Sequence, residues 1–192
     1  MKLRMTTGLG ALALTLTTIA VTVLPSSAAP ARSGGTWAAS SVSCAVTWGS
    51  LAKADQTPVD AATLFNVRSG RHACFDRLVL DGSSFLRVRY VDQVRADGSG
   101  DVVPLRGGAR LEIITNTASG AETTNPPYQP ANRRELVDVT GYQTFRQVAW
   151  AGDFEGQSTI GLGVRARLPF RVFVLLSIDG PPRAVVDVAH HW

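Results

Sequence analysis

The residues best suited to chemistry gather in and just before one glycine-rich stretch, residues 152–173. Two carboxylates lie two positions apart, which would place both on one face of a strand, and aromatic rings and arginines flank them. Paired carboxylates can exchange protons, arginine forks bind carboxylates, and flat aromatic rings suit sugar rings. The candidate ligand contacts are Trp150, Asp153, Phe154, Glu155, Arg165 and Arg167.

The glycines of this stretch need an explanation, because glycine weakens a strand. Close approach by another chain is one reason, and it would leave residues 150–167 as a ligand surface with Arg165 and Arg167 binding carboxylates. The alternative is that the glycines serve a bulge, Trp150 and Phe154 belong to the core, and the arginines neutralise nearby acids.

No catalytic site is predicted. His72 lies in a turn, and His190 and His191 would point to opposite faces of a strand, which is poor geometry for sharing a metal ion. The run GQSTIG at 156–161 misses the spacing of a serine nucleophile elbow by one position. We therefore expect a non-enzymatic protein with no metal and no cofactor.

The first residues are typical of a secretory signal peptide. Lys2 and Arg4 precede an apolar run, and a small-residue cleavage site follows at 25–28. Residues 1–28 are expected to be removed, with cleavage after Ala31 or an uncleaved anchor as alternatives. The segment has no lipobox cysteine, so we expect a secreted or wall-associated protein with no stable membrane anchor after cleavage.

Charge gives little reason to expect a nucleic-acid partner. The whole chain carries a net charge of +4, but Lys2 and Arg4 supply two of these charges and would leave with the leader. The cations are almost all arginine, and high-GC codon usage explains this more simply than a binding role does.

Cys44 and Cys74 are the only cysteines, and in an exported chain a single pair predicts one disulfide. Two free thiols are the alternative. The bridge would staple residues 29–63, a flexible leader with a distinctive TWGSLAK run at 47–53, to the following domain. Trp48 would then be held against that domain.

Residues 64–192 are predicted to form one all-β domain, a β-sandwich of short, mostly antiparallel strands, with no helical periodicity. Turn signals separate the expected strands, and Asp97-Gly98 is a hairpin signal. The strands are expected at residues 64–69, 75–81, 85–91, 111–116, 135–140, 144–149, 159–164, 170–176 and 183–189.

Two of these strands carry the same pattern, R-x-V-[L/V]-D, at 77–81 and 183–187. Period two puts its Arg, Val and Asp on one face each time. Either the strands are ordinary ones with a local ion pair, or they occupy equivalent places in a pseudo-symmetric sandwich.

The ordered set of these runs resembles the AMIN-like domain family of high-GC Gram-positive bacteria over about residues 64–192. The runs are GRHACFDRLVLDG, VRYVDQVRADGSGDVVPLRGGARLEI, QVAWAGDFEGQSTIGLGVRARLPFRVF and PRAVVDVAH. The resemblance implies a β-sandwich module of the cell envelope, and better-known AMIN domains bind peptidoglycan.

Two functions follow as hypotheses. The first is a non-enzymatic module that binds peptidoglycan or another wall polymer. The alternative is a structural or regulatory partner of another envelope protein, which would use an exposed strand edge or apolar patch.

Overall fold

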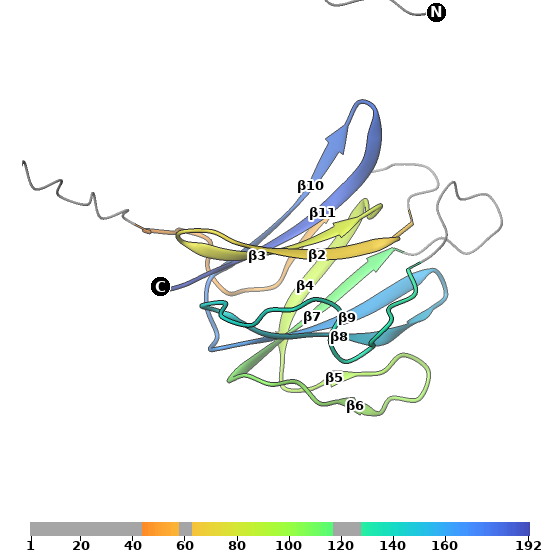
Figure 1. The fold of residues 1–192 in the computed structure, drawn as a ribbon, viewed down its shortest axis with the longest axis horizontal. Helices are drawn as coiled ribbons and strands as arrows, with labels where there is room; N and C mark the ends of the chain where they lie inside the picture. The colour runs from red at the N-terminus through yellow and green to blue at the C-terminus, as the bar shows by residue number, and fades with distance from the viewer. Residues whose placement is uncertain (1–43, 58–62, 117–127) are drawn as a thin grey trace, which may run out of the picture. The chain divides into compact units, whose positions relative to one another are not determined.

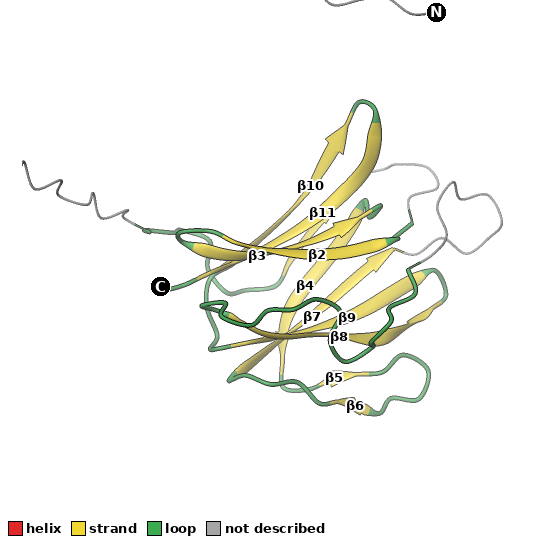
Figure 2. Cartoon of the chain, viewed as in Figure 1, coloured by secondary structure: helices red, strands yellow, loops and turns green. Residues whose placement is uncertain are grey.

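A computed structural model describes residues 44–57, 63–116 and 128–192. Within these ranges the chain forms strands and loops and no helix, as predicted (Figure 2). Residues 117–132 contain three prolines and are predicted from the sequence to form a long surface loop. The predicted signal peptide, most of the leader and much of this proline-rich loop lie outside the described residues.

Two antiparallel sheets face one another and form the predicted sandwich (Figure 1). The five-stranded sheet has the order β1-β4-β7-β9-β8, with every neighbouring pair antiparallel. Its strands are β1 (Lys53–Gln56), β4 (Phe85–Val91), β7 (Ala109–Asn116), β9 (Gln157–Val164) and β8 (Phe145–Phe154).

The second sheet has four strands in the order β10-β11-β3-β2, again antiparallel throughout. Its strands are β10 (Phe170–Ser177), β11 (Gly180–Ala189), β3 (Phe75–Asp81) and β2 (Asn66–Arg71). A short ribbon of β5 (Val94–Arg95) and β6 (Val102–Val103) completes the fold.

The core lies between the two sheets, because each strand turns alternate apolar side chains inward. Leu78 and Leu80 of β3 are fully buried there, as their alternation predicted, and Ile160 and Leu162 of β9 face them from the other sheet. A smaller apolar cluster forms under the β5–β6 ribbon. Packing in these cores fixes the positions of the two sheets, and therefore of the side chains on their outward faces.

Strand prediction succeeded where alternation was bounded by turn residues. β3 and β4 have the expected bounds, and β5 and β6 flank the Asp97-Gly98 turn, where Gly98 has a φ of 82°. The strand predicted at 135–140 is wrong: Asp138 accepts a hydrogen bond from the Thr140 N–H, and this local turn competes with an extended ladder.

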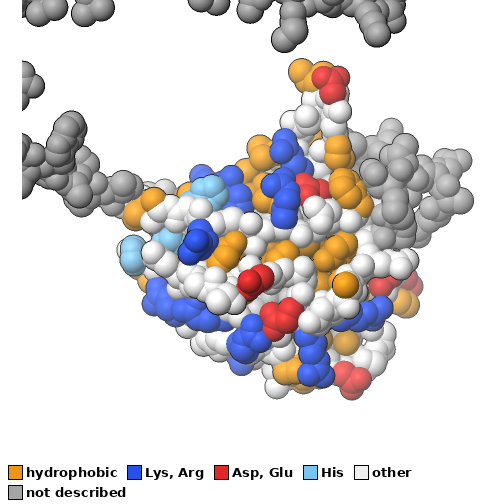
Figure 3. Space-filling view, viewed as in Figure 1, with side chains coloured by type: hydrophobic (Ala, Val, Ile, Leu, Met, Phe, Trp, Pro, Cys, Tyr) orange, Lys and Arg blue, Asp and Glu red, His pale blue; other side chains and the backbone are white. Residues whose placement is uncertain are grey.

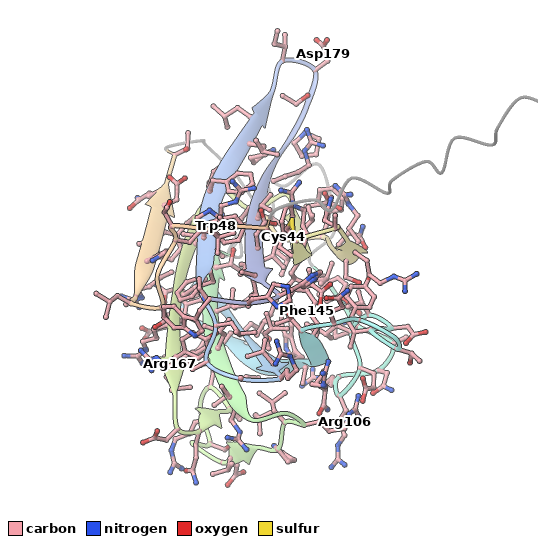
Figure 4. The ribbon with its side chains drawn as sticks, turned by 90° about the vertical axis from the view of Figure 1, so that its left-hand side faces the viewer. Cys44, Trp48, Arg106, Phe145, Arg167 and Asp179 are labelled. Atoms are coloured by element: carbon pink, nitrogen blue, oxygen red, sulfur yellow. A yellow bond between two sulfur atoms is a disulfide. The ribbon has the colours of Figure 1, made fainter. Side chains whose placement is uncertain are left out.

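The disulfide between Cys44 and Cys74 forms as predicted and staples the N-terminal segment to the four-stranded sheet. The Phe170 N–H then donates to the Gly49 carbonyl, and the segment continues into β1, a strand the sequence did not predict. Trp48 is held against the sheet near this bridge (Figure 4).

Candidate functional site

The structure divides the six candidate ligand contacts between two places. Trp150, Asp153, Phe154 and Glu155 lie along the second half of β8 and its turn into β9. Arg165 and Arg167 follow the other end of β9. With Asp153 paired to Ser158, the strand rise puts about 20 Å between the two groups.

A surface hollow of about 450 Å³ lies at the first group. A loop that precedes β8 forms one side, and β8 forms the other. Its lining residues are Tyr128, Gln129, Pro130, Arg133, Trp150 and Asp153, and we call it the Trp150 hollow. The loop is fixed there because the Trp150 N–H donates to the Arg133 carbonyl at 2.7 Å and the Tyr128 N–H to the Leu64 carbonyl.

Two aromatic rings form the wall of the Trp150 hollow. Tyr128 and Trp150 meet edge to face, with 5.7 Å between ring centroids. Trp150 packs into the main core and only 7% of it is exposed, so a ligand would meet its rim rather than its face. Burial raises the pKa of the Tyr128 hydroxyl, which therefore stays protonated at neutral pH.

Opposite charges stand at the mouth of the hollow. Arg133 and Asp153 are both exposed, and neither side chain has a hydrogen bond or an ion pair with another described residue. A guanidinium and a carboxylate remain available beside an aromatic wall, with the Gln129 amide near them. This set can receive a ligand that carries a carboxylate together with an amine or hydroxyl groups.

Phe154 and Glu155 stand at the tip of the β8–β9 hairpin, beside the hollow. Phe154 is 58% exposed, which is unusual for a large apolar ring. Glu155 has a φ of 48° and Gly156 a φ of 80°, so both central residues of the turn are left-handed. That is the geometry of the tight turn that suits a two-residue hairpin, and Glu155 adopts it at a cost.

Arg165 and Arg167 are exposed, but both are engaged within the chain. Arg165 donates to the His190 carbonyl at 2.5 Å, and Arg167 donates to both the side chain and the carbonyl of Ser50. The Arg167 guanidinium also lies over the Tyr90 ring, 4.9 Å from its centroid. These contacts fasten the N-terminal segment and the C-terminus.

The close approach at Gly161 and Gly163 is made by the chain itself. A Cβ on Gly161 would lie 2.7 Å from Leu105, and one on Gly163 would lie 2.0 Å from the Arg106 carbonyl oxygen. Residues 105 and 106 therefore cover this part of β9. Gly152, with a φ of 134°, sits at an irregularity in the β8–β9 ladder.

Sequence reasoning missed Tyr128, Gln129 and Arg133. Tyr128 and Gln129 lie in the proline-rich loop, which was treated only as a surface connection, and Arg133 directly follows it. The local sequence carries no signal that this segment lies beside β8, where the Trp150 N–H donates to the Arg133 carbonyl and the Leu136 N–H to the Val148 carbonyl. The one hint was composition, since a tyrosine and two arginines lie close together in the run YQPANRR at 128–134.

The histidines lie away from the hollow. His190 is buried and its Nε2 is 3.2 Å from a carboxylate oxygen of Asp76, which also accepts the N–H groups of Thr144 and Phe145. Within the described ranges, no group of three or more His, Cys, Asp or Glu side chains could hold a metal ion.

The fold and the hollow define a small β-sandwich with a polar and aromatic surface site. A family model, the AMIN-like domain, matches residues 62–190, and the chain belongs to this family. Membership confirms the resemblance noted from the sequence and suggests a cell-envelope-associated module. No curated protein and no solved structure matches the chain. The described residues include no helix long and apolar enough to cross a membrane.

Proposed function

We propose that this protein is a non-enzymatic, secreted or wall-associated module that binds peptidoglycan through the Trp150 hollow. The observation that carries the proposal is the pairing of unsatisfied charges with an aromatic wall at one surface hollow. Peptidoglycan offers sugar rings, free carboxylates and, on uncross-linked peptide stems, free amines. Arg133 would take a carboxylate, Asp153 an amine or hydroxyls, and the rims of Trp150 and Tyr128 a sugar ring.

Phe154 and Glu155 extend this surface to the hairpin tip. Arg165 and Arg167 stay in the proposal as a separate contact for stem carboxylates, because a polymer can reach both ends of β9. Their existing bonds to backbone carbonyls leave other guanidinium nitrogens for a ligand.

The direct test is binding of soluble peptidoglycan fragments, measured by calorimetry with the full secreted chain. Arg133→Gln and Asp153→Asn should each weaken binding about tenfold or more, since each removes one charge-assisted contact. The matched control is Arg134→Gln, a neighbouring arginine outside this hollow. Both arginine substitutions leave the backbone contacts of the loop in place. Equal binding by all variants would place the ligand elsewhere.

A second function, docking to another envelope protein, is favoured by one observation. The β10–β11 hairpin projects beyond the sandwich, and Asp179 marks its tip (Figure 4). Leu176 is 59% exposed and Ile178 fully exposed there, and apolar and acidic side chains meet at this end (Figure 3). The Val174 N–H donates to Asp55 of β1, and beyond this bond no described strand pairs with the outer edge of β10.

A photo-crosslinking residue at position 178 tests this second function in cells. It should give one discrete adduct with an envelope protein, whereas the same residue at the exposed position 92 should give none. Loss of the adduct on Leu176→Ser would tie it to the apolar tip, and equal adducts from both positions would rule the hairpin out.

A further inference from the structure

The outer face of the four-stranded sheet carries a second charged surface, distinct from the Trp150 hollow on the other sheet. The two R-x-V-[L/V]-D runs lie on β3 and β11, which pair antiparallel. Each arginine therefore stands opposite the aspartate of the other run, Arg77 opposite Asp187 and Arg183 opposite Asp81. Arg77 and Asp187 form an ion pair, whereas the partner of Asp81 is Arg68 of β2 and not Arg183. The repeated pattern therefore belongs to two ordinary neighbouring strands with one local ion pair between them.

Asp187 holds two arginines at once. Its carboxylate is fully buried and accepts from Arg77 at 2.6 and 2.8 Å and from Arg171 of β10 at 2.8 Å. Hydrogen bonding to Asp187 raises the pKa of Arg77. Because one carboxylate serves two guanidinium groups, the cluster keeps an excess of one positive charge.

Aromatic rings fix the two guanidinium groups in place. Arg171 lies 4.4 Å from the Trp48 ring centroid, and both arginines lie between 5.1 and 5.5 Å from the centroids of Phe75 and Phe173. The disulfide delivers Trp48 to this position, since Cys74 directly precedes Phe75. We call Trp48, Phe75, Arg77, Arg171, Phe173 and Asp187 the arginine clamp.

The clamp leaves donors for a ligand. Arg77 uses its Nε and Nη2 on Asp187, and Arg171 uses only its Nε. The Nη1 of Arg77 and both terminal nitrogens of Arg171 have no hydrogen-bond partner among the described residues. The side chain of Arg171 is 40% exposed and that of Arg77 is 24% exposed, so solvent reaches these groups.

Positive charge extends along the same face. Arg68 and Arg183 stand further along the sheet, and both aspartates of the face are buried, with Asp81 held by Arg68 at 2.9 and 3.0 Å. Four arginines thus present their charge above two buried carboxylates. A ligand with repeated negative charges would meet this row more favourably than a single anion would.

We propose that the arginine clamp binds a phosphate group of a linear, phosphodiester-linked polymer. The two free oxygens of a phosphodiester diverge tetrahedrally and can each accept from one arginine of the clamp, whereas a planar carboxylate is satisfied by one fork. The neighbouring arginines then take the next phosphates. This ligand differs from peptidoglycan, and the arginine clamp lies on the four-stranded sheet, whereas the Trp150 hollow lies on the five-stranded sheet. Either proposal can therefore fail without the other.

The test is calorimetry on the full secreted chain with poly(glycerol phosphate) as the phosphodiester probe. Poly-L-glutamate of equal charge is the carboxylate probe. The phosphodiester should bind at least about tenfold more tightly than the carboxylate polymer. The ratio of their two dissociation constants should become smaller as the salt concentration rises. Equal or tighter binding of poly-L-glutamate, or binding of neither polymer, would overturn the proposal.

Variants separate the clamp from general attraction to positive charge. Arg171→Gln should weaken phosphodiester binding about tenfold or more, and Arg171→Lys should do so nearly as much. Lysine keeps the charge, but it lacks the planar set of donors with which Arg171 binds Asp187 through Nε and would bind the phosphate through a terminal nitrogen. The matched control is Arg89→Gln, an exposed, ion-paired arginine on the five-stranded sheet. Full binding by Arg171→Lys, or an equal loss in Arg89→Gln, would contradict the clamp. Thermal melts confirm that each variant is folded.

Discussion

At the scale of single residues, two residues near the proposed ligand surface have unfavourable properties: one has a strained backbone and the other has a shifted pKa. Glu155 is the one non-glycine residue with positive φ in the described ranges. Asp97, in the β5–β6 turn, has its pKa raised by burial, despite a hydrogen bond from Thr159 and with smaller repulsion from Glu112 and Asp153. We expect both residues to lower stability at neutral pH, and each expectation can be tested by one substitution.

Glu155→Asn should stabilise the protein by about 0.5–1 kcal/mol, because asparagine tolerates the left-handed conformation better than glutamate does. The midpoint of urea unfolding measures the gain. Glu155→Ala is the control and should give no comparable increase, since alanine has the same steric penalty. A fall in stability on Glu155→Asn would show that the glutamate side chain compensates for its own strain.

Asp97→Asn should raise the melting temperature at pH 7. A raised folded pKa means that Asp97 favours the folded state below its unfolded pKa of about 3.9, and this contribution is lost as pH rises through the folded pKa. Asparagine cannot ionise and its amide oxygen still accepts from Thr159. Melts from pH 3 to 7 should therefore show the two proteins converging at low pH. A difference that grows at low pH would contradict the burial effect.

At the scale of elements, sequence patterns located most of the strands but not the loop that packs beside β8. β3 and β4 were predicted with their observed bounds because alternation ended at turn residues. The same reasoning found Trp150 and Asp153 of the hollow, but not Tyr128 or Arg133, since a loop docks by tertiary contacts that have no period. It also placed Trp150 and Arg165 in one ligand site, although residues several positions apart along extended strands lie far from each other.

Gly163→Ala should destabilise the protein by more than about 2 kcal/mol, because the new Cβ would lie 2.0 Å from the Arg106 carbonyl oxygen. Gly98→Ala is the comparison: its Cβ meets nothing within 4 Å, but its φ of 82° costs about 1 kcal/mol. Chemical denaturation should rank Gly163→Ala as the more damaging change. The reverse order would mean that residues 105 and 106 pack loosely over β9.

Replacing both cysteines, Cys44→Ser with Cys74→Ser, should lower the free energy of unfolding by about 3.6 kcal/mol for a loop of 30 residues. Tryptophan fluorescence should change with it, because Trp48 loses its anchor over Arg171. An unchanged unfolding midpoint would show that β1 and its bond to β10 hold the segment without the bridge.

At the scale of the whole molecule, the two sheets offer different surfaces. The five-stranded sheet carries a hollow with mixed charge and aromatic rims, and the four-stranded sheet carries arginines over buried aspartates. Net charge from the sequence did not reveal the second surface, because it counts buried and exposed charges alike. If both proposals hold, the two faces would bind two chemical components of one cell wall.

The most direct measurement of the central claim is co-sedimentation of the protein, residues 29–192, with purified sacculi, compared with chitin and cellulose. If the protein binds peptidoglycan, it should pellet with sacculi in a saturable way, and soluble peptidoglycan fragments should release it. Chitin and cellulose, which lack peptide stems, should leave it in the supernatant. Protein that stays in solution with sacculi, or pellets equally with all three polymers, would contradict the claim.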